Sequence, residues 1–327
     1  MSFASFHNIS ISGIATAVPT QKHAVEGQTA SDLGFAAAEK LLEEKITNRS
    51  ELGFIVFLTK TPDYRSPASA IVLQHRLQLP IDCLAYDVNL GALGFVAGIQ
   101  LGCSLINGLN TRKGLIVIGD TNSKQLEDQH PLLAHFGDGA TAILLEQAAS
   151  STINLATFSQ GEGYQSYLLP GGGFRTNERR KAYNLSGLPT ASEDHRLRYD
   201  QEQLFRFFSA KIPTDLKEFL AKISCTTTSF DKVAFHYAAP DFISAIVSEA
   251  GFDEEDICVG SDVHTDVSGA TIPLLLNSAD EGKRVLGIAY GEGFSWGFID
   301  FYLNENTVLP LIKTDVYYTE GFVTHEI

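Results

Sequence analysis

The chain alternates short apolar, β-branched runs with longer segments in which apolar residues recur every three or four positions. The short runs predict strands and the longer segments predict amphipathic helices. Strands are expected at Ile9–Ile14, Phe54–Leu58, Cys83–Val88, Gly114–Ile118, Ala140–Leu145, Ile153–Phe158, Val233–His236, Gly287–Ala289 and Gly297–Tyr302. Helices are expected at Ala30–Glu44, Pro67–Arg76, Gln203–Ile223, Asp241–Ala250 and Ile272–Ala279. This order of elements indicates an α/β fold.

One segment, Leu90–Leu109, carries no charge over a length that would suffice for a membrane span. Gln100, Ser104 and Asn107 interrupt its apolar pattern, and no other uncharged segment approaches its length. We therefore interpret it as a helix buried on all sides in a large core, and we expect no membrane association.

Two pairs of short motifs recur in the same order along the chain. Phe57–Asp63 aligns with Phe235–Asp241, and Phe136–Gly139 aligns with Tyr290–Gly293. The repeat predicts two similar α/β halves, residues 1–147 and 148–327, that meet near Glu146–Ser151. Their sheets are covered on both sides only if the halves face each other, which gives five α/β/α/β/α layers.

The charge balance and the cysteines narrow the function classes. The 327 residues include 24 Lys and Arg against 39 Asp and Glu, a formal net charge of −15, which disfavours binding to nucleic acid and anionic lipid. The four cysteines are far apart without a CxxC pair, so we expect neither a zinc site nor disulfides. Neither His135 nor His264 has metal-ligand spacing. The first ten residues do not resemble a secretory signal, so a cytoplasmic location is expected.

The segment Asp87–Phe95 resembles the nucleophile segment of the β-ketoacyl-acyl-carrier-protein synthase III family, which has the thiolase fold. Further segments resemble family landmarks in family order: Thr61–Ser69, Phe136–Ala140, Pro170–Arg175, Phe235–His236, Ser268–Pro273 and Gly291–Trp296. The resemblance implies a thiolase-like fold with two pseudo-symmetric halves. It also implies a function with acyl thioesters in fatty-acid or polyketide-type biosynthesis.

The resemblance places the family's site residues on this chain. The nucleophile position is Ala92, whose methyl group cannot form a thioester. His236 takes the family's His position, and Asp266 replaces its Asn. The backbone N–H groups of Ala92 and Gly293 are the expected oxyanion donors. From the residues alone, His236 is equally a core histidine, Asp266 a turn or N-cap residue, and Gly293 a glycine needed only for its conformation.

The family's coenzyme A clamp is missing from the sequence. Family members carry a longer connection between the first strand and the first helix, with a Trp and an Arg that hold the coenzyme. Here Val18–His23 leads almost directly to Thr29, and the only Trp is Trp296. We expect no cofactor and no metal, and we assign no cofactor-binding residue. Cys103, deep in the buried helix, is expected to be a core residue and not a second nucleophile.

Three functions remain open. The chain is a non-catalytic subunit that pairs with an active homologue, or a Cys-His-Asp acyltransferase or condensing enzyme in which Ala92 replaces the native Cys. In the third, His236 and Asp266 transfer an acyl group directly from a carrier protein. Expected partners are an acyl carrier protein or acyl thioester and a second chain, as a homodimer or a heterodimer, with the apolar region Leu79–Tyr86 in the contact. The acyl chain and the acceptor stay undetermined.

Overall fold

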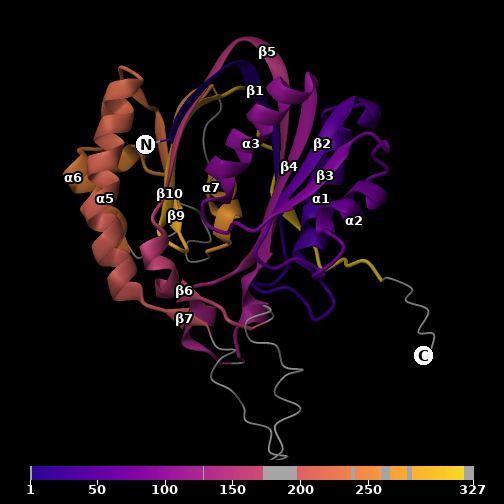
Figure 1. The fold of residues 1–327 in the computed structure, drawn as a ribbon, viewed down its shortest axis with the longest axis horizontal. Coiled ribbons are helices and arrows are strands. Elements are labelled where there is room, and N and C mark those ends of the chain that lie inside the picture. The colour runs from indigo at the N-terminus through magenta and orange to yellow at the C-terminus, as the bar shows by residue number, and fades with distance from the viewer. Residues whose placement is uncertain are drawn as a thin grey trace, which may run out of the picture.

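The structure is a computed structural model, and it describes residues 2–127, 129–171, 197–236, 240–258, 266–277 and 282–319. Helices and strands form five alternating layers, with two outer helical layers, two sheet layers and a helical layer between them (Figure 1). The predicted α/β fold and its layered arrangement are therefore confirmed. The motif Pro170–Arg175 beyond residue 171, Tyr237–Ala239, His264 and the end of the tail lie outside the described residues.

The two sheet layers are wings of one hydrogen-bonded sheet whose strands follow the order β3-β2-β4-β5-β10-β9-β8, with β1 pairing with β5 and β11. The strands are β1 (Ser2–Val18), β2 (Leu52–Leu58), β3 (Leu84–Val88), β4 (Lys113–Thr121), β5 (Asp138–Ser159), β8 (Lys232–Phe235), β9 (Lys283–Gly291), β10 (Ser295–Leu303) and β11 (Ile312–Lys313). The first part of β5 pairs with β4, and its last part pairs with β10. The N-terminal wing and the C-terminal wing are thus joined through β5.

In the part of the chain that the structure describes, six helices cover these wings. They are α1 (Ala30–Glu44), α2 (Ser69–Arg76), α3 (Gly94–Leu109), α5 (Gln201–Lys222), α6 (Pro240–Ala250) and α7 (Thr271–Leu276). Helices α3 and α7 lie between the wings, α1 and α2 cover the outer face of the N-terminal wing, and α5 and α6 cover the outer face of the C-terminal wing (Figure 1). In β2, Phe54, Val56 and Leu58 face α3, while Ile55 and Phe57 face α1 and α2. Burial on both faces explains why the strands read as continuous apolar runs.

Helix α3 begins only at Gly94, and it is not buried on all sides as predicted. One face packs in the core, whereas Leu101, Ser104 and Leu109 on the other face are exposed, because no described element covers that face. Its glycines allow the strands to approach closely, since a Cβ at Gly102 would lie 2.4 Å from Leu145 Cδ1. Asn110 ends the helix in the left-handed conformation. Among the helices in the described ranges, none has the length and apolar character that crossing a bilayer requires.

The strands at the junction of the two predicted halves differ from expectation. The sequence predicts two strands, Ala140–Leu145 and Ile153–Phe158, whereas the structure has the single strand β5. Its partner β1 is long enough to pair with both parts of β5. The pairing continues past the middle of β5 through a register shift between His7 and Ile9 of β1. The predicted boundary at residues 147 and 148 therefore falls inside a shared strand.

The described part of the C-terminal tail, residues 309–319, packs against the connection between β1 and α1. Strand β11 pairs with β1, and the buried side-chain amide of Gln28 donates hydrogen bonds to the carbonyl oxygens of Thr314 and Val316. The N–H of Tyr318 donates to Asp32 Oδ1. The tail thus covers the short connection in which the sequence lacks a coenzyme clamp.

Candidate functional site

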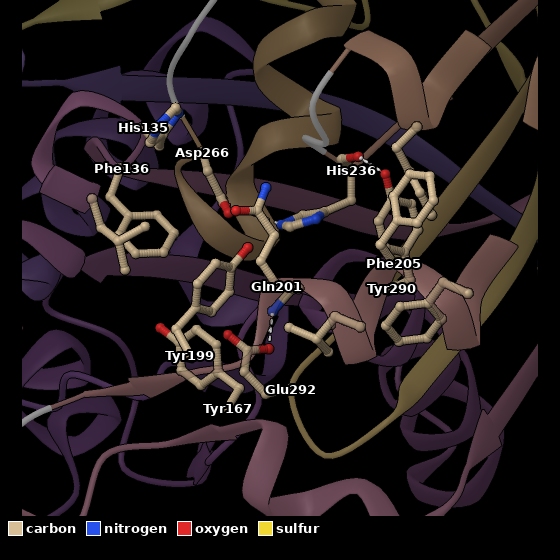
Figure 2. Close-up of a pocket in the computed structure, with 16 residues that line it drawn as sticks. His135, Phe136, Tyr167, Tyr199, Gln201, Phe205, His236, Asp266, Tyr290 and Glu292 are labelled. Atoms are coloured by element: carbon tan, nitrogen blue, oxygen red, sulfur yellow. Dashed lines mark hydrogen bonds and ion pairs between the residues drawn. The ribbon is translucent and has the colours of Figure 1, made fainter. Parts of the chain in front are cut away.

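A cavity of about 130 Å³ opens between the N-terminus of α3, the turn from β9 to β10 and the first turns of α5 (Figure 2). Its polar members are His135, Tyr167, Tyr199, Gln201, His236, Asp266 and Glu292, and its apolar wall comes from Leu132, Phe136, Leu204, Phe205, Phe208, Phe242 and Tyr290. Ala92 and Gly291 complete the lining. Three residues predicted from sequence, Ala92, His236 and Asp266, therefore line one cavity.

Ala92 lies in the tight turn that leads into α3. The N–H of Gly94 donates to the carbonyl oxygen of Gly91, which leaves the N–H of Ala92 pointing out of the turn. The Ala92 side chain is only 3% exposed. A Cβ at Gly291 would lie 2.4 Å from Ala92 Cβ, so position 291 accepts only glycine in this packing. The close approach of the β9–β10 turn leaves little space around the Ala92 methyl group.

His236 and Asp266 form a buried pair across the cavity floor. His236 Nε2 lies 3.2 Å from Asp266 Oδ1, an ion-pair distance, but neither ring nitrogen has the geometry of a hydrogen bond to a described residue. The same Oδ1 accepts a hydrogen bond from the N–H of Ser268 at 2.7 Å. Asp266 thus combines the two roles left open by the sequence, a turn residue and a partner of His236. Burial works to raise the pKa of Asp266, but His236, Lys60 and the Ser268 N–H hold it below its usual value.

A second pair, the partly buried Lys60 and Glu292, was not predicted. Lys60 Nζ lies 2.5 Å from Glu292 Oε1, and Glu292 Oε2 accepts a hydrogen bond from the N–H of Ala92 at 3.1 Å. Lys60 Nζ also donates to the Tyr167 hydroxyl oxygen at 3.1 Å. A signal was available, since Glu292 is a charged residue between two glycines and Lys60 lies two positions after an apolar strand. The predicted oxyanion donor at Ala92 is therefore engaged by a carboxylate.

Asp120 lies behind Lys60 and completes this charged group. Its Oδ1 accepts hydrogen bonds from the N–H of Lys60 and from the hydroxyl of Thr59. Burial works to lower the pKa of Lys60, but Glu292, Tyr167 and Asp120 together hold it well above its usual value. Burial likewise works to raise the pKa of Glu292, and Lys60 holds it below its usual value. Both groups of the pair are therefore stabilised in their charged forms.

Gly293, the second predicted oxyanion donor, lies beside the cavity wall and is not part of the lining. Its φ is +67°, a conformation that favours glycine irrespective of activity. Gly291 and Glu292 line the cavity instead. Cys103 is fully buried in α3, and burial raises the pKa of its thiol to about 12, which fits the expected core role.

The described residues offer no metal site, since they contain no group of three His, Cys, Asp or Glu side chains suited to one. The sole tryptophan is also not placed to hold a coenzyme. Trp296 stacks on Phe158 with ring centroids 4.9 Å apart, and its indole N–H donates to Asp215 at 2.9 Å inside the core under α5.

Comparison with known sequences gives one consistent family. The model of 3-oxoacyl-[acyl-carrier-protein (ACP)] synthase III matches residues 86–162, and the model of the C-terminal part of the same enzyme matches residues 220–301. The chain is 29% identical over 291 residues to the β-ketoacyl-[acyl-carrier-protein] synthase III of Rhizorhabdus wittichii, covering 86% of each chain. It is 25% identical over 286 residues to the same enzyme of Streptococcus suis, covering 85% of each chain.

Comparison with solved structures gives the same result. A 3-oxoacyl-(acyl-carrier protein) synthase from Burkholderia xenovorans superposes with a TM-score of 0.86 at 25% identity, covering 95% of this chain and 99% of that one. The β-ketoacyl-[acyl carrier protein] synthase III of Thermus thermophilus superposes with a TM-score of 0.78 at 22% identity, covering 90% and 99%, and supports the fold alone.

Proposed function

Because the chain is a β-ketoacyl-acyl-carrier-protein synthase III-like protein with the thiolase fold, we propose that it is a non-catalytic subunit. In this proposal it acts in fatty-acid or polyketide-type biosynthesis and pairs with an active homologue. One observation carries the proposal: at the turn that would hold the nucleophile, the side chain is a methyl group and the backbone N–H of Ala92 already donates to Glu292.

Acyl transfer through a covalent thioester needs a nucleophile and hydrogen-bond donors for the oxyanion. Ala92 supplies no nucleophile. A thioester oxygen that approached the Ala92 N–H would have to displace Glu292 Oε2, which Lys60 holds from the other side at 2.5 Å. Negative charge developing on that oxygen would also be repelled by the Glu292 carboxylate. The site therefore opposes both steps of acyl-enzyme formation.

The edge of the N-terminal wing provides the surface proposed for pairing. Strand β3 ends the sheet order and pairs with β2 on one side only. Leu84 and Tyr86 on this strand are exposed, and Ile81 just before it is fully exposed. An apolar edge strand of this kind is a template for another strand, and we propose that a second thiolase-fold chain covers it.

The names of the relatives support a proposal for the partner. The relatives that the chain resembles are named for an acyl carrier protein, and we propose such a carrier, or an acyl thioester, as the partner of the two paired chains.

All four cysteines are free, and burial raises the pKa of Cys83 and Cys103 to about 12. Free cysteines support a reducing compartment, and we propose the cytoplasm.

One observation favours a second candidate. His236 Nε2 and Asp266 Oδ1 are 3.2 Å apart and line the cavity together with Ala92. If a Cys stood at position 92, the three residues would have the composition of a Cys-His-Asp acyltransferase. In that case the native residue at position 92 is Cys, and the chain is an enzyme captured in an inactive form.

The two candidates are separated by restoring the thiol. The protein, the Ala92→Cys variant and the Ala92→Cys/Glu292→Gly variant are each incubated with an acyl-CoA and with an acylated carrier protein, and acyl adducts are mapped by intact mass and peptide mass. We expect no adduct at position 92 in the first two, because Glu292 opposes the thiolate and occupies the N–H. Acylation should begin only in the double variant.

Rapid acylation and turnover by the single Ala92→Cys variant would overturn the non-catalytic proposal and establish the acyltransferase. An adduct on the unmodified chain at any residue that lines the cavity would overturn both. Ala92→Cys/Glu255→Gln, which removes an exposed carboxylate outside the cavity lining, is the matched control and should behave as Ala92→Cys.

A further inference from the structure

The charges around the cavity are unbalanced. Asp266 and Glu292 line it, with side chains 15% and 22% exposed, and Asp120 lies directly behind Lys60. Within the described ranges, Lys60 is the one ammonium group that contacts this set. Among the sixteen lining residues that the structure describes there is neither lysine nor arginine. Three carboxylates thus stand against the Lys60 ammonium group and the His236 imidazole, and Asp120 lies behind Lys60, outside the cavity lining.

Hydrogen-bonding capacity remains unused at the cavity floor. Asp266 Oδ1 is held by the Ser268 N–H, whereas Asp266 Oδ2 accepts no hydrogen bond from any described residue. The His236 side chain is 6% exposed, and neither of its ring nitrogens has a hydrogen-bond partner among the described residues. Buried ring nitrogens such as those of His236 usually have partners, and Asp266 Oδ2 is an acceptor that a donor in the cavity can use.

The walls are aromatic. Phe136, Tyr167 and Tyr199 form one corner in which neighbouring rings meet edge to face, and Phe205 and Tyr290 lie on the opposite side (Figure 2). The Phe242 ring packs against the rings of Phe205 and Tyr290. The faces of such rings attract cations, as Lys60 over the Tyr167 ring at 4.7 Å already illustrates. The cavity volume of 130 Å³ is close to that of an engineered cavity of about 150 Å³ that holds benzene.

From the excess of carboxylates, the free Asp266 oxygen and the aromatic walls, we propose that this cavity binds a small organic amine in its ammonium form. The ammonium group donates to Asp266 Oδ2, and an apolar skeleton of about the size of a phenyl ring fills the aromatic wall. Carboxylates and phosphates are repelled by Asp266 and Glu292. This binding site is independent of whether the chain pairs with an active homologue.

The test compares matched ligands. 2-Phenylethylamine and hexylamine are titrated calorimetrically into the full chain, together with the corresponding alcohols and with 3-phenylpropanoate. We expect at least one amine to bind about tenfold more tightly than its alcohol, and the carboxylate to bind most weakly. The amine affinity should fall as NaCl is raised, while that of the alcohol stays constant. Equal affinity of amine and alcohol, or no binding of either amine, would overturn the proposal.

Variants then locate the site. Asp266→Asn should weaken amine binding about tenfold and leave alcohol binding unchanged, because the amide keeps the shape and loses the charge. Glu255→Gln, at an exposed position away from the cavity, is the control and should bind like the unmodified chain. Phe205→Leu should weaken the amine through the lost ring face, and it provides a second readout if Asp266→Asn unfolds. Undiminished amine binding in both variants would place the ligand elsewhere and refute the site. Acylation assays do not enter this test, so its failure is distinct from a failure of the proposed function.

Discussion

Glu292 carries a charge into the turn between β9 and β10, where burial alone would make that charge costly. Two contacts offset the cost: the ion pair with Lys60 and the hydrogen bond from the Ala92 N–H. Position 91 must stay small beside the carboxylate, since a Cβ at Gly91 would lie 2.6 Å from Glu292 Oε1. The carboxylate, its lysine and the small residues around it therefore act as one unit.

Removing only the lysine should be more damaging than removing both charges. Lys60→Met leaves Glu292 without its cation, and we expect the free energy of unfolding to fall by about 3 kcal/mol. The Lys60→Met/Glu292→Gln double variant should recover to within about 1 kcal/mol of the unmodified chain. Urea unfolding measures the free energy of unfolding of the unmodified chain and of both variants. A double variant as unstable as Lys60→Met would contradict the coupling.

The same pair predicts how stability depends on pH. The Glu292 pKa in the folded chain lies below its ordinary value of 4.5, because Lys60 outweighs the effect of burial. A lowered folded-state pKa stabilises the fold above the unfolded-state pKa, and this contribution is lost as the pH falls below about 4.5. Between about pH 5 and about pH 3, Glu292→Gln should therefore lose less stability than the unmodified chain. Glu255→Gln, measured alongside, should follow the unmodified chain.

Helix α3 is the element on which both wings pack. Phe95, Ile99 and Ile106 point into the core between the wings, and Gly94, Gly98 and Gly102 face the strands at close range. Small residues on the buried face let the sheet approach the helix backbone, and this approach places Ala92 beside the β9–β10 turn. The position of the cavity floor is thus a consequence of the packing of α3.

Two glycines of α3 should respond in opposite ways to the same substitution. Gly102→Ala adds a methyl group 2.4 Å from Leu145 Cδ1 in a filled core, and should cost about 1 to 3 kcal/mol of stability. Gly108→Ala adds it where no atom lies within 4 Å, and should raise stability by about 0.5 kcal/mol through helix propensity. Thermal and urea unfolding of both variants measures whether each substitution raises or lowers the free energy of unfolding. Equal effects would mean that the helix packs differently.

The molecule as a whole is a sheet folded around α3 and α7, in which β1 and β5 run through both wings. The tail closes the side near α1, where the Arg76 guanidinium lies between the rings of Phe35 and Tyr318. Strand β3, at the edge of the N-terminal wing, is by contrast uncovered, since no strand among the described residues pairs with its outer side. The molecule therefore has one protected side and one open apolar edge.

We predict that the purified chain forms a dimer through this edge. Light scattering at micromolar concentration should give twice the chain mass of 35.6 kDa. Tyr86→Asp places a charge on the exposed face of β3 and should shift the protein towards the monomer. Tyr164→Asp, at an exposed tyrosine outside β3, should remain dimeric. A monomeric mass for the unmodified chain would contradict the prediction, and a dimer unaffected by Tyr86→Asp would move the interface elsewhere.

Much of the fold followed from local pattern. The bounds of α1 were predicted to the residue, because Thr29 and Asp32 form a capping box before an amphipathic run. The division of β5 into two strands was wrong, because hydrogen bonds to the distant β1 continue the strand through a polar segment that has no local strand signal. The convergence of Ala92, His236 and Asp266 was anticipated only through the resemblance, since their spacing along the chain carries no geometric information.

By itself, the sequence determined the layered α/β architecture, the uncharged helix α3 and the absence of a nucleophile at position 92. These properties depend on apolar periodicity and on side-chain chemistry, and both can be read from neighbouring residues. Only the tertiary structure decided that Glu292 occupies the Ala92 N–H, that Lys60 neutralises it and that Asp266 keeps an oxygen free towards the cavity. The contacts of Glu292 join residues two hundred or more positions apart, and the free energy of a buried charge depends on which groups the completed fold brings within a few ångströms of it.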